Sequence, residues 1–584
     1  MSLTPPIDTS IISRQQLLSC SRGEIPCDLV LKNGQVVNTF TGEVLEQDVG
    51  IFQGLVAGIG QYSGHHEVDV KGRYICPGFI EGHIHIESSM LSPLQFARAV
   101  VPRGTTAVVC DPHEIANVLG VRGVSFMLEF SKDLPLDIFS MIPSCVPATD
   151  METSGATLAP NDIDMLLARP GVPGLAEMMN FPGAIGGDPE VLAKIRTALD
   201  RNQPVDGHAP GVSGKQLQAY CACGISSDHE CTTLEEAREK LRAGMYIFIR
   251  EGSTAKNLEA LLPLITPETA QWFLLVSDDR HPDDLLAQGH LDHILRRVVA
   301  LGLDPITALK LVTINPAIRF GLKMRGALAP GYLADAVIVD DLSSFTVHQV
   351  YKEGRLVAHD AEEVEKHFCP AAETDHVLPV DSIHIDWTAV DFRIPAQPGK
   401  VRVIECVEGQ IITGLTELEP TISRDEAVAD PARDLLKIAV IERHRASGNM
   451  TNGFVRGFGL REGAMASTVA HDSHNLIVVG TSDALMLAAS RLVADSGGGI
   501  ALLNHEKSII LPLPIAGLMS MESLQEVSGI LFRLKQFAEE MKIKIDNPFM
   551  LLSFLALPVI PTLKITDKGL VDVLAFQTVP LRVE

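Results

Sequence analysis

Two histidines separated by one residue, His83 and His85, end an apolar segment with the sequence GFIEGHIHIE. Residues two apart on a strand share a face, so both imidazoles can point to the same side and bind one cation. Imidazole is a common ligand of first-row transition-metal ions. Because such a pair also occurs by chance, its interpretation depends on the other residues of the region.

Four further ionisable groups end strand-like segments later in the chain. An ionisable side chain is costly to bury unless it is paired or binds a metal, so a merely structural role is disfavoured for the whole set. Imidazole mixed with carboxylate suits a divalent transition metal such as iron or manganese. We therefore predict that the histidine pair shares one metal centre with Glu177, His208, His229 and Asp278.

The segments that must position these side chains alternate between two patterns. Eight short segments between residues 78 and 280 are typical of strands, and segments such as 188–202 and 233–244 are typical of the helices between them. This alternation predicts a parallel α/β fold, and eight strands fit a closed (β/α)8 barrel. In such barrels the chemistry lies at the C-terminal ends of the strands, where these histidines and carboxylates fall.

Two β-rich segments, at 28–74 and 326–357, flank the barrel in the sequence and could form one small sandwich. The chain of 584 residues is also too long for one hydrophobic core. The predicted organisation is therefore the N-terminal part of a β-sandwich at 1–75, the barrel at 76–325, the rest of the sandwich at 326–373 and an additional C-terminal α+β domain at 374–584.

The composition is that of a folded, acidic protein. The net charge is -25, and a surface of this sign repels nucleic acid and anionic membranes, so neither is an expected partner. The ten cysteines are scattered and are expected to be buried free thiols. Because the first residues lack a signal-peptide pattern and no segment is apolar enough to span a membrane, a cytoplasmic location is predicted.

Several longer strings carry a family resemblance. The string PGFIEGHIHIESSM, with the split sandwich and the ordered ligand set, resembles the amidohydrolase superfamily. The strings GTTAVVCDPHEIANVLG at 104–120, GLAEMMNFPG at 174–183, VDGHAPGVSG at 205–214 and ASTVAHDSHNLIVVG at 466–480 resemble, more closely, the microbial adenine deaminases. The resemblance covers nearly the whole chain, and the CDPHEIANV and AHDSHN strings are its most specific parts.

The resemblance implies two divalent metal ions in each active site, manganese or iron, with zinc as a further candidate. It assigns His83, His85 and Asp278 to one ion, His208 and His229 to the other, and Glu177 to both. Many members of the superfamily use a carbamylated lysine as the bridge, but GVPGLAEMMN contains no lysine. Strand alternation predicts that the adjacent Asp279 faces away from the metals.

The implied reaction is hydrolytic deamination of adenine to hypoxanthine and ammonia, a step of purine salvage. A metal-activated hydroxide would attack C6, and Asp278 would carry the proton of the water toward the leaving group. His113 and Glu114 are candidates for a supporting catalytic role, although Glu114 could simply favour a helix dipole. Arg280 and His281 either border the site or belong to a loop surface.

The string His471-Asp472-Ser473-His474 is the candidate site outside the barrel. Its two histidines are three apart, so they share a face only on a helix or in a turn. Three interpretations stay open from the sequence. His471, Asp472 and His474 could line the substrate site, hold a separate ion or form a hydrogen-bonded polar turn.

Two other classes of function compete with adenine deamination. One is another amidohydrolase reaction, on a cyclic amide or an N-acetyl sugar, and the other is a non-catalytic barrel that serves as a scaffold. Because all six ligand positions hold competent residues, the scaffold is disfavoured. The expected partners are a small-molecule substrate, the free base rather than the nucleoside, and further copies of the chain in a dimer or tetramer.

Overall fold

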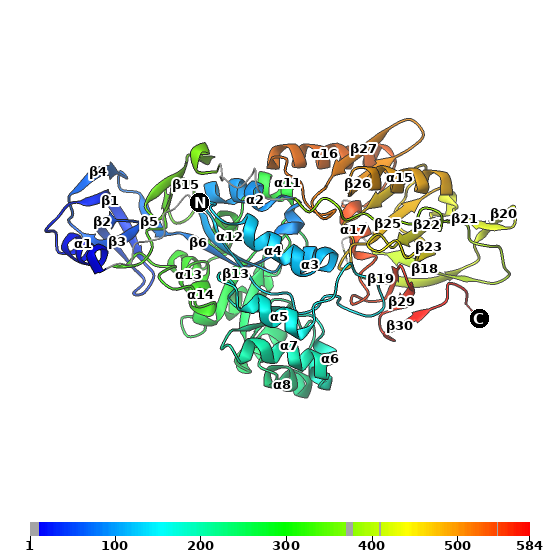
Figure 1. Ribbon diagram of the computed structural model, residues 1–584, viewed down its shortest axis with the longest axis horizontal. Coiled ribbons are helices and arrows are strands. Elements are labelled where there is room, and N and C mark those ends of the chain that lie inside the picture. Colours follow the sequence, from blue (N-terminus) through cyan, green and yellow to red (C-terminus); the bar gives the residue numbers. More distant parts are fainter. Residues whose placement is uncertain (1–10, 369–377, 408–409, 411, 546, 584) are drawn as a thin grey trace.

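The computed structural model describes residues 11–368, 378–407, 410, 412–545 and 547–583. The first ten residues and the predicted boundary between 373 and 374 lie outside these ranges. Figure 1 shows the chain as three parts along its long axis, with a β-rich part at one end, a barrel in the middle and a second β-rich part, followed by the C-terminus, at the other. Helix α1 (Ile11–Ser21) packs on the first part.

The two predicted halves of the sandwich are joined by hydrogen bonds. Within residues 11–368 they form one nine-stranded sheet of order β17-β16-β15-β14-β5-β1-β2-β3, with β4 paired to β1. The junction is the antiparallel pair β5–β14, and the sheet surrounds an apolar core that includes Val36, Ile51 and Ile338. The strands are β1 (Cys27–Asn38), β2 (Glu43–Phe52), β3 (Leu55–Gly60), β4 (Gly64–Asp69), β5 (Tyr74–Pro77), β14 (Ala336–Val339), β15 (Val347–Lys352), β16 (Arg355–His359) and β17 (Glu362–Glu363).

The barrel strands correspond to the eight segments expected from the sequence. In the same described stretch they are β6 (Phe79–Ile84), β7 (Thr105–Cys110), β8 (Asp137–Ser140), β9 (Leu175–Met178), β10 (Val205–Gly207), β11 (Ser227–Asp228), β12 (Tyr246–Arg250) and β13 (Phe273–Val276). Parallel pairing joins β6 to β7 and β8, β9 to β10, and β11 to β12 and β13. Bridges from Ile142 to Leu175 and from Ile84 to Asp278, and a hydrogen bond from the Ser226 N–H to the Val205 carbonyl between β10 and β11, continue the ring. The second bridge closes the barrel by joining the end of β6 to the residues after β13.

Side chains alternate between the two faces of each barrel strand. Ala107 and Val109 of β7 belong to the cluster inside the barrel, together with Phe248 of β12, whereas Val108 and Cys110 pack outward against the helices. The covering helices are α2 (Pro93–Val100), α3 (His113–Leu119), α4 (Val121–Phe130), α5 (Pro160–Leu167), α6 (Phe181–Gly186), α7 (Pro189–Leu199), α8 (Gly214–Ala222), α9 (Leu234–Arg242), α10 (Leu258–Leu261), α11 (Pro282–Ala287), α12 (Leu291–Ala300), α13 (Pro305–Leu311) and α14 (Ile314–Arg319).

The C-terminal part contains its own sheet. Among its described residues, eight strands run in the order β19-β18-β23-β22-β25-β24-β26-β27. They are β18 (Val401–Cys406), β19 (Thr413–Leu418), β22 (Leu436–Ile441), β23 (Met450–Arg456), β24 (Ala464–Ser467), β25 (Leu476–Gly480), β26 (Gly499–Leu503) and β27 (Ser508–Pro512). Smaller pieces are β20 (Thr421–Ser423), β21 (Glu426–Val428), β28 (Leu563–Thr566), β29 (Gly569–Asp572) and β30 (Gln577–Val579), and the helices are α15 (Asp483–Asp495), α16 (Leu524–Glu540) and α17 (Pro548–Phe554).

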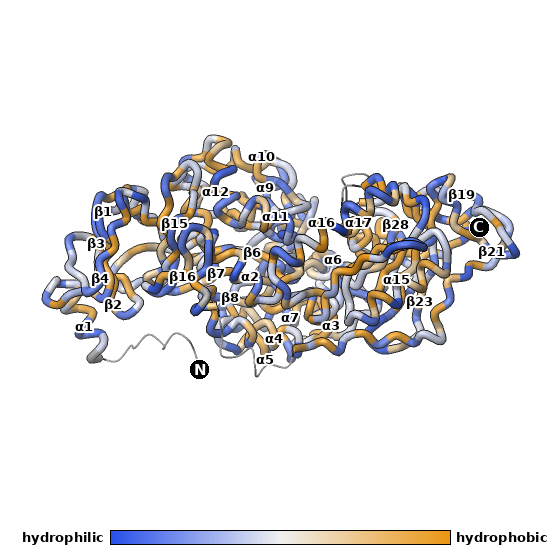
Figure 2. Tube along the Cα trace, turned by 90° about the horizontal axis from the view of Figure 1, so that it is seen from above, coloured by the Kyte–Doolittle hydropathy of each residue, from blue (hydrophilic) through white to orange (hydrophobic). Residues whose placement is uncertain are grey.

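The C-terminal sheet is buried on both faces, and one of them connects to the barrel. Helix α15 covers one face, where Met486 and Val493 pack on Val478. On the other face Ile438 and Ile477 belong to the same continuous apolar cluster as the barrel residues, and Figures 1 and 2 show α16 beside α11 of the barrel. This apolar continuity fixes the C-terminal part against the barrel.

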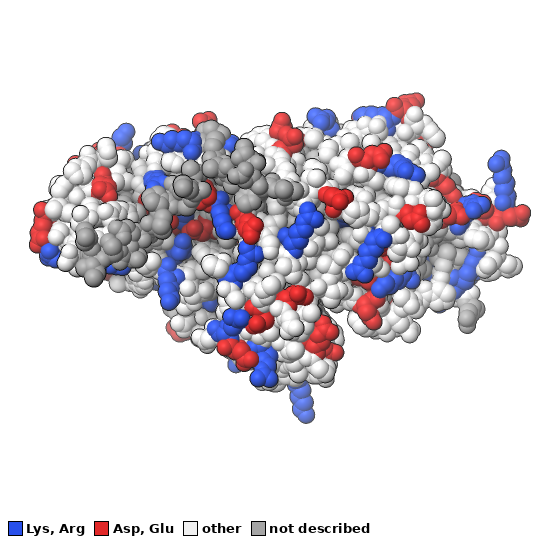
Figure 3. Space-filling model, viewed as in Figure 1, with Lys and Arg blue, Asp and Glu red and all other residues white. Residues whose placement is uncertain are grey.

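Two whole-chain properties bear on partners. Figure 3 shows acidic and basic side chains interspersed over the face in view, so the negative net charge is not gathered there into one patch. In the described part of the chain, no helix is both long enough and apolar enough to cross a membrane.

Candidate metal centre and adjoining cavity

His83 lies near the end of β6 and His85 directly follows that strand at the barrel mouth; the two residues are 3% and 4% exposed. Their Nε2 atoms face one oxygen, Oδ1 of Asp278, at 3.4 and 3.2 Å. Nδ1 of His85 lies 3.0 Å from the main-chain carbonyl of Asp111, so this nitrogen carries the proton and donates it. The unprotonated Nε2 is left for a cation, as in many metal-binding histidines.

Asp278 lies just beyond β13 and has a left-handed backbone conformation, with a φ of 56°. Its N–H donates to the His83 carbonyl at 3.1 Å, which holds the residue at the closure of the barrel. Strand alternation predicts that the neighbouring Asp279 faces away from the metals. Its carboxylate turns from the histidines toward Ser88, yet it lines the cavity at the barrel mouth, because the chain has already left the regular strand.

Glu177, at the end of β9, lies between two groups of histidines. Its Oε1 is 3.3 Å from Nε2 of His85. Its Oε2 is 2.7 Å from Nδ1 of His208 and 3.2 Å from Nε2 of His229. One buried carboxylate therefore directs one oxygen to each group, which is the arrangement expected of a residue that contacts two cations.

The six side chains predicted as ligands fit a metal by their chemistry and their positions. One group with converging donor atoms contains His83, His229 and Asp278, and another contains Glu177, His208 and His229; within each, the donor atoms lie within 4.8 Å of one another. Nε2 of His83 is buried without a hydrogen-bond partner in the described chain. An orphaned imidazole nitrogen aimed at carboxylates is what a cation would satisfy.

Sequence reasoning did not identify Arg250 and Glu230 as part of this site. Nη1 of Arg250, at the end of β12, contacts Oε1 of Glu230 and lies 3.2 Å from Oδ2 of Asp278. Oε1 of Glu230 is 3.4 Å from Nε2 of His229. The signal was a charged residue that ends the apolar strand YIFIR, the same feature that identified the ligands.

His113 and Glu114 begin α3 and point in different directions. His113 lies beside the predicted ligands, with Nδ1 3.2 Å from Oδ2 of Asp111 and 3.5 Å from Oε1 of Glu177. Burial disfavours its charge, but the Asp111 carboxylate outweighs this and raises the pKa of His113 to about 10. Glu114 is 1% exposed and contacts the Ser88 hydroxyl at 3.0 Å, so it does more than favour the helix dipole from the solvent side.

The C-terminal part brings its histidine-rich string to this place. Nδ1 of His471 lies 3.6 Å from Oε1 of Glu114, and Nε2 of His474 lies 4.0 Å from Oε2 of the same residue. Oδ1 of Asp472 is 4.0 Å from Nε2 of His113. The string between β24 and β25 therefore forms part of the wall around the barrel mouth, as one of the three interpretations of the sequence proposes.

His474 is held as a hydrogen-bond donor. The main-chain N–H of Ala470 donates to its Nδ1 at 3.2 Å, so the neutral ring carries its proton on Nε2. Burial, above all, keeps the pKa of His474 well below its ordinary value, so the ring is neutral. A protonated Nε2 does not ligate a cation, and this arrangement disfavours a separate ion on His474.

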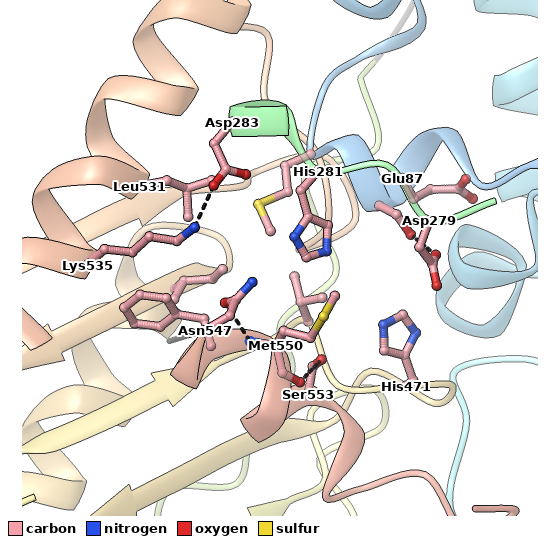
Figure 4. A pocket seen from close by; sticks show the side chains of 15 residues that line it. Glu87, Asp279, His281, Asp283, His471, Leu531, Lys535, Asn547, Met550 and Ser553 are labelled. Carbon is pink, nitrogen blue, oxygen red and sulfur yellow. Dashed lines mark hydrogen bonds and ion pairs between the residues drawn. The ribbon is translucent and has the colours of Figure 1, made fainter. Parts of the chain in front are cut away.

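A cavity lies beside the metal centre, between the barrel and the C-terminal part (Figure 4). His281 lines it, whereas Arg280 is 1% exposed and donates to the Gly289 carbonyl and to Gln288 inside the barrel wall. Across the seam, the Lys535 ammonium pairs with Asp283 at 2.5 Å. The lining residues include Glu87, Ser88, Asp279, His281 and Asp283 from the barrel, and His471, Leu531, Lys535, Asn547, Met550 and Ser553 from the C-terminal part.

Two family models match the chain. Residues 74–357 match the model of the amidohydrolase family, and residues 410–577 match that of the adenine deaminase C-terminal domain. The first match covers the barrel with its flanking strands, and the second covers most of the part that carries His471 and His474.

Several relatives are similar over their full lengths. An adenine deaminase of Desulfatibacillum aliphaticivorans is 51% identical over 97% of this chain and 99% of its own, and one of Methanothrix thermoacetophila is 45% identical over 98% and 100%. Among solved structures, a D-hydantoinase matches 58% of this chain and 96% of its own, with 17% identity and a TM-score of 0.44. An enamidase matches 57% and 96%, with 14% identity and a TM-score of 0.43.

Proposed function

This chain belongs to the adenine deaminase family, and we propose that it hydrolyses adenine to hypoxanthine and ammonia in purine salvage. The observation that carries the proposal is the convergence of six imidazole and carboxylate side chains at the ends of β6, β9, β10, β11 and β13, in a chain 51% identical to an adenine deaminase. The family of the barrel is metal-dependent, and the donor set fits that dependence.

For the metal centre we propose two divalent ions, manganese or iron, with zinc as the alternative. His83, His85 and Asp278 would hold one ion, His208 and His229 the other, and Glu177 would contact both with its two oxygens. When bound, such ions act as Lewis acids that make water a stronger acid and a nucleophile near neutral pH.

Asp278 is the group that moves the proton of the attacking water. Burial disfavours its charge, but the positive charge around it, including the Arg250 guanidinium 3.2 Å from Oδ2, outweighs this and holds the pKa of Asp278 well below its ordinary value. The residue is therefore a carboxylate at neutral pH, able to accept a proton. It passes that proton to the departing amino group, so that ammonia leaves.

Ring nitrogen N1 of adenine must gain a proton while C6 becomes tetrahedral. His113 and Glu114 are the supporting groups for this requirement, since both are buried beside the metal centre. Burial raises the pKa of Glu114 to about 8, so its carboxyl group keeps a proton at neutral pH. Asp472, which faces His113 from the C-terminal part, helps to hold that imidazole in place.

We propose that adenine binds in the cavity between the barrel and the C-terminal part. His471 lines the cavity, and its ring stacks on Phe554 with centroids 4.6 Å apart, which fixes the plane that it presents. The matched C-terminal family model argues for adenine over a cyclic amide or an N-acetyl sugar. The complete ligand set argues against a non-catalytic scaffold.

The test combines metal analysis with an ammonia-release assay. Purified protein is expected to contain divalent metal and to release ammonia from adenine. Dihydroorotate and N-acetylglucosamine 6-phosphate are expected to remain unchanged. Acid release from either compound, without ammonia from adenine, would support the alternative hydrolase, and protein without metal or turnover would support the scaffold. The cytoplasmic location and the dimer or tetramer stay predictions of the sequence.

A further inference from the structure

Two histidines and an aspartate come together on the nine-stranded sheet. His348 lies on β15, His359 ends β16 and Asp360 follows it directly. Oδ1 of Asp360 lies 2.5 Å from Nδ1 of His348, and Oδ2 lies 3.0 Å from Nδ1 of His359. The two imidazole rings have centroids 4.9 Å apart. Two imidazoles thus face one carboxylate, and Figures 1 and 2 show β15 and the C-terminal part on opposite sides of the barrel.

The strand register and a tight turn bring these residues together. Strands β15 and β16 are antiparallel with Gln349 opposite His359, and the Asp360 N–H donates to the His348 carbonyl at 2.8 Å. Asp360 and Ala361 form the two-residue turn between β16 and β17, with φ values of 51° and 65°. A turn of this kind needs a positive φ at both central residues, and aspartate accepts that conformation more readily than most residues. The main chain therefore fixes Asp360 beside both histidines.

The donor atoms converge closely enough for one cation. One donor atom from each of the three side chains lies within 4.8 Å of the other two. A zinc ion binds imidazole nitrogen and carboxylate oxygen at about 2.0–2.2 Å, so tetrahedral geometry separates neighbouring ligand atoms by roughly 3.3 Å. The nitrogen–oxygen contacts of 2.5 and 3.0 Å therefore widen by less than about 1 Å when an ion enters.

The ladder adds a second carboxylate. Glu362 stands directly opposite His359 in the antiparallel pair of β16 and β17. Residues in this relation share a face of the sheet, with Cβ atoms about 4.5–5.5 Å apart. Glu362 is exposed, so its flexible side chain can reach an ion held by the histidines, either directly or through a water molecule.

Without an ion, the same contacts are ordinary hydrogen bonds. Each Nδ1 then carries the proton of a neutral imidazole and donates it to the carboxylate. For an ion to bind, each ring must carry its proton on Nε2 instead, so that the Nδ1 lone pair is free. The side chains of His348 and His359 are 24% and 46% exposed, so water can accept the Nε2 proton in that state. The change of tautomer releases no proton and leaves no donor unsatisfied.

The donor set selects the kind of ion. Two imidazoles and a carboxylate suit a divalent transition-metal ion such as zinc, whereas magnesium and calcium prefer a shell of oxygen atoms. The partial exposure of the cluster leaves positions at which water completes the coordination.

We propose that His348, His359 and Asp360 form a zinc site that is separate from the metal centre of the barrel. The ion links β15 to the hairpin of β16 and β17, which is the edge of the sheet. The same edge contacts the barrel, because Oε1 of Glu363 lies 3.0 Å from Nη1 of Arg98 on α2. The site therefore stabilises the edge of the sheet beside the barrel. It shares no ligand with the proposed catalytic centre, and the inference does not depend on the proposed function.

The first test compares zinc content. Wild type, His348→Ala, His359→Ala and the control His66→Ala, a change of an exposed histidine on β4 of the same sheet, are incubated with excess zinc sulfate and freed of unbound ion. Wild type and His66→Ala are expected to retain one equivalent of zinc more than the other two variants. Metal in the barrel is counted in all four proteins and cancels in the difference. Their rates of adenine turnover are expected to be equal.

Hydrogen exchange locates the additional ion. At a free zinc concentration ten times the Kd, amide exchange through local opening of residues 347–363 is expected to slow by ~10-fold in the wild type, because zinc binds only the closed hairpin. The same residues are expected to exchange at an unchanged rate in His348→Ala. Asp360→Asn is a milder variant, since asparagine also accepts the turn conformation, and it is expected to lose the additional zinc.

Three results would overturn the zinc site. Equal zinc content in the wild type and both histidine variants would leave only a hydrogen-bonded cluster. An additional ion that does not change the exchange of residues 347–363 would lie elsewhere in the protein. If the histidine variants do not fold, wild-type zinc content in Asp360→Asn would exclude the carboxylate as a ligand and the site with it. An absence of ammonia release from adenine would contradict the proposed function and leave all three measurements valid.

Discussion

At the scale of single residues, the site depends on which atom each side chain presents. The Asp111 carbonyl binds Nδ1 of His85 and leaves Nε2 for a cation, while the Ala470 N–H binds Nδ1 of His474 and makes its Nε2 a donor. Two histidines in similar surroundings are thereby suited to opposite roles. Residue type alone does not distinguish the two histidines, but the hydrogen bond made by Nδ1 of each ring does.

The histidine pair gives the first prediction. His83→Ala or His85→Ala is expected to lower the bound metal and to reduce adenine turnover together, because both Nε2 atoms converge on Asp278. Metal analysis and the ammonia assay on the same preparation measure both quantities. His66→Ala, on an exposed part of β4, is the control and should change neither. Full metal and wild-type turnover in either variant would refute the ligand assignment.

The adjacent aspartates give the second prediction. Asp278→Asn is expected to reduce kcat by ~10⁴-fold, the upper range for acid–base catalysis, and to weaken metal binding as well. Asp279→Asn is expected to cause a smaller loss of kcat and to keep its metal, because Asp279 contacts Ser88 and not the histidines. Steady-state kinetics and metal analysis are the measurements. If Asp279→Asn lost more activity and more metal than Asp278→Asn, the roles of the two aspartates would be exchanged.

At the scale of elements, one buried side chain supports the loop between β24 and β25. Arg443, just beyond β22, is fully buried and donates to the carbonyls of Ser382, His474 and Ala516. Main-chain carbonyls in a buried loop need donors. The guanidinium supplies several at once, so it sets the position at which the loop meets Glu114.

The third prediction follows from this support. Arg443→Met is expected to lower the Tm, since each carbonyl left without a donor costs about 1–3 kcal/mol, and to reduce kcat while the barrel retains its metal. Thermal unfolding, metal analysis and the adenine assay are the measurements. Arg445→Met, two residues away and exposed, provides the comparison. Unchanged Tm and kcat in Arg443→Met would mean that the loop keeps its position without the guanidinium.

At the scale of the whole molecule, the cavity is built from two parts of the chain. The barrel contributes Asp279 and His281, and the C-terminal part contributes His471 and Met550. A continuous apolar cluster runs from one part to the other, and the Lys535–Asp283 pair spans the seam. Neither part alone forms the cavity, so the C-terminal part acts as one of its walls.

The cavity between the two parts gives the fourth prediction. Adenosine carries a ribose on N9, and close-packed walls make room for added atoms only at a cost of kilocalories per mole. The enzyme is therefore expected to prefer adenine by at least ~100-fold in kcat/KM, about 2.7 kcal/mol of transition-state free energy. The change in ultraviolet absorbance measures both rates. Comparable rates would exclude a closed cavity and the free-base specificity, but would leave the barrel and its metal centre unaffected.

The sequence by itself determined the barrel and the positions of its metal-binding candidates. Apolar segments of strand length recur with helices between them, and each candidate follows such a segment, so His83, His85, Glu177, His208 and His229 were recognisable from local patterns. These features depend on neighbouring residues only. The resemblance of the CDPHEIANV and AHDSHN strings to adenine deaminases indicated adenine as the substrate.

Only the tertiary structure decided how Glu114, Ser88, Asp279 and His474 meet. Ser88 and Asp279 are separated by 191 positions along the chain, and His474 comes from another part of the molecule. No local pattern specifies such a contact, because it depends on how the barrel closes and on how the apolar faces of two sheets pack together. The position of Asp279 in the cavity wall could not be predicted for the same reason, since strand alternation stops where the chain leaves β13 and packing alone directs the side chain into the cavity.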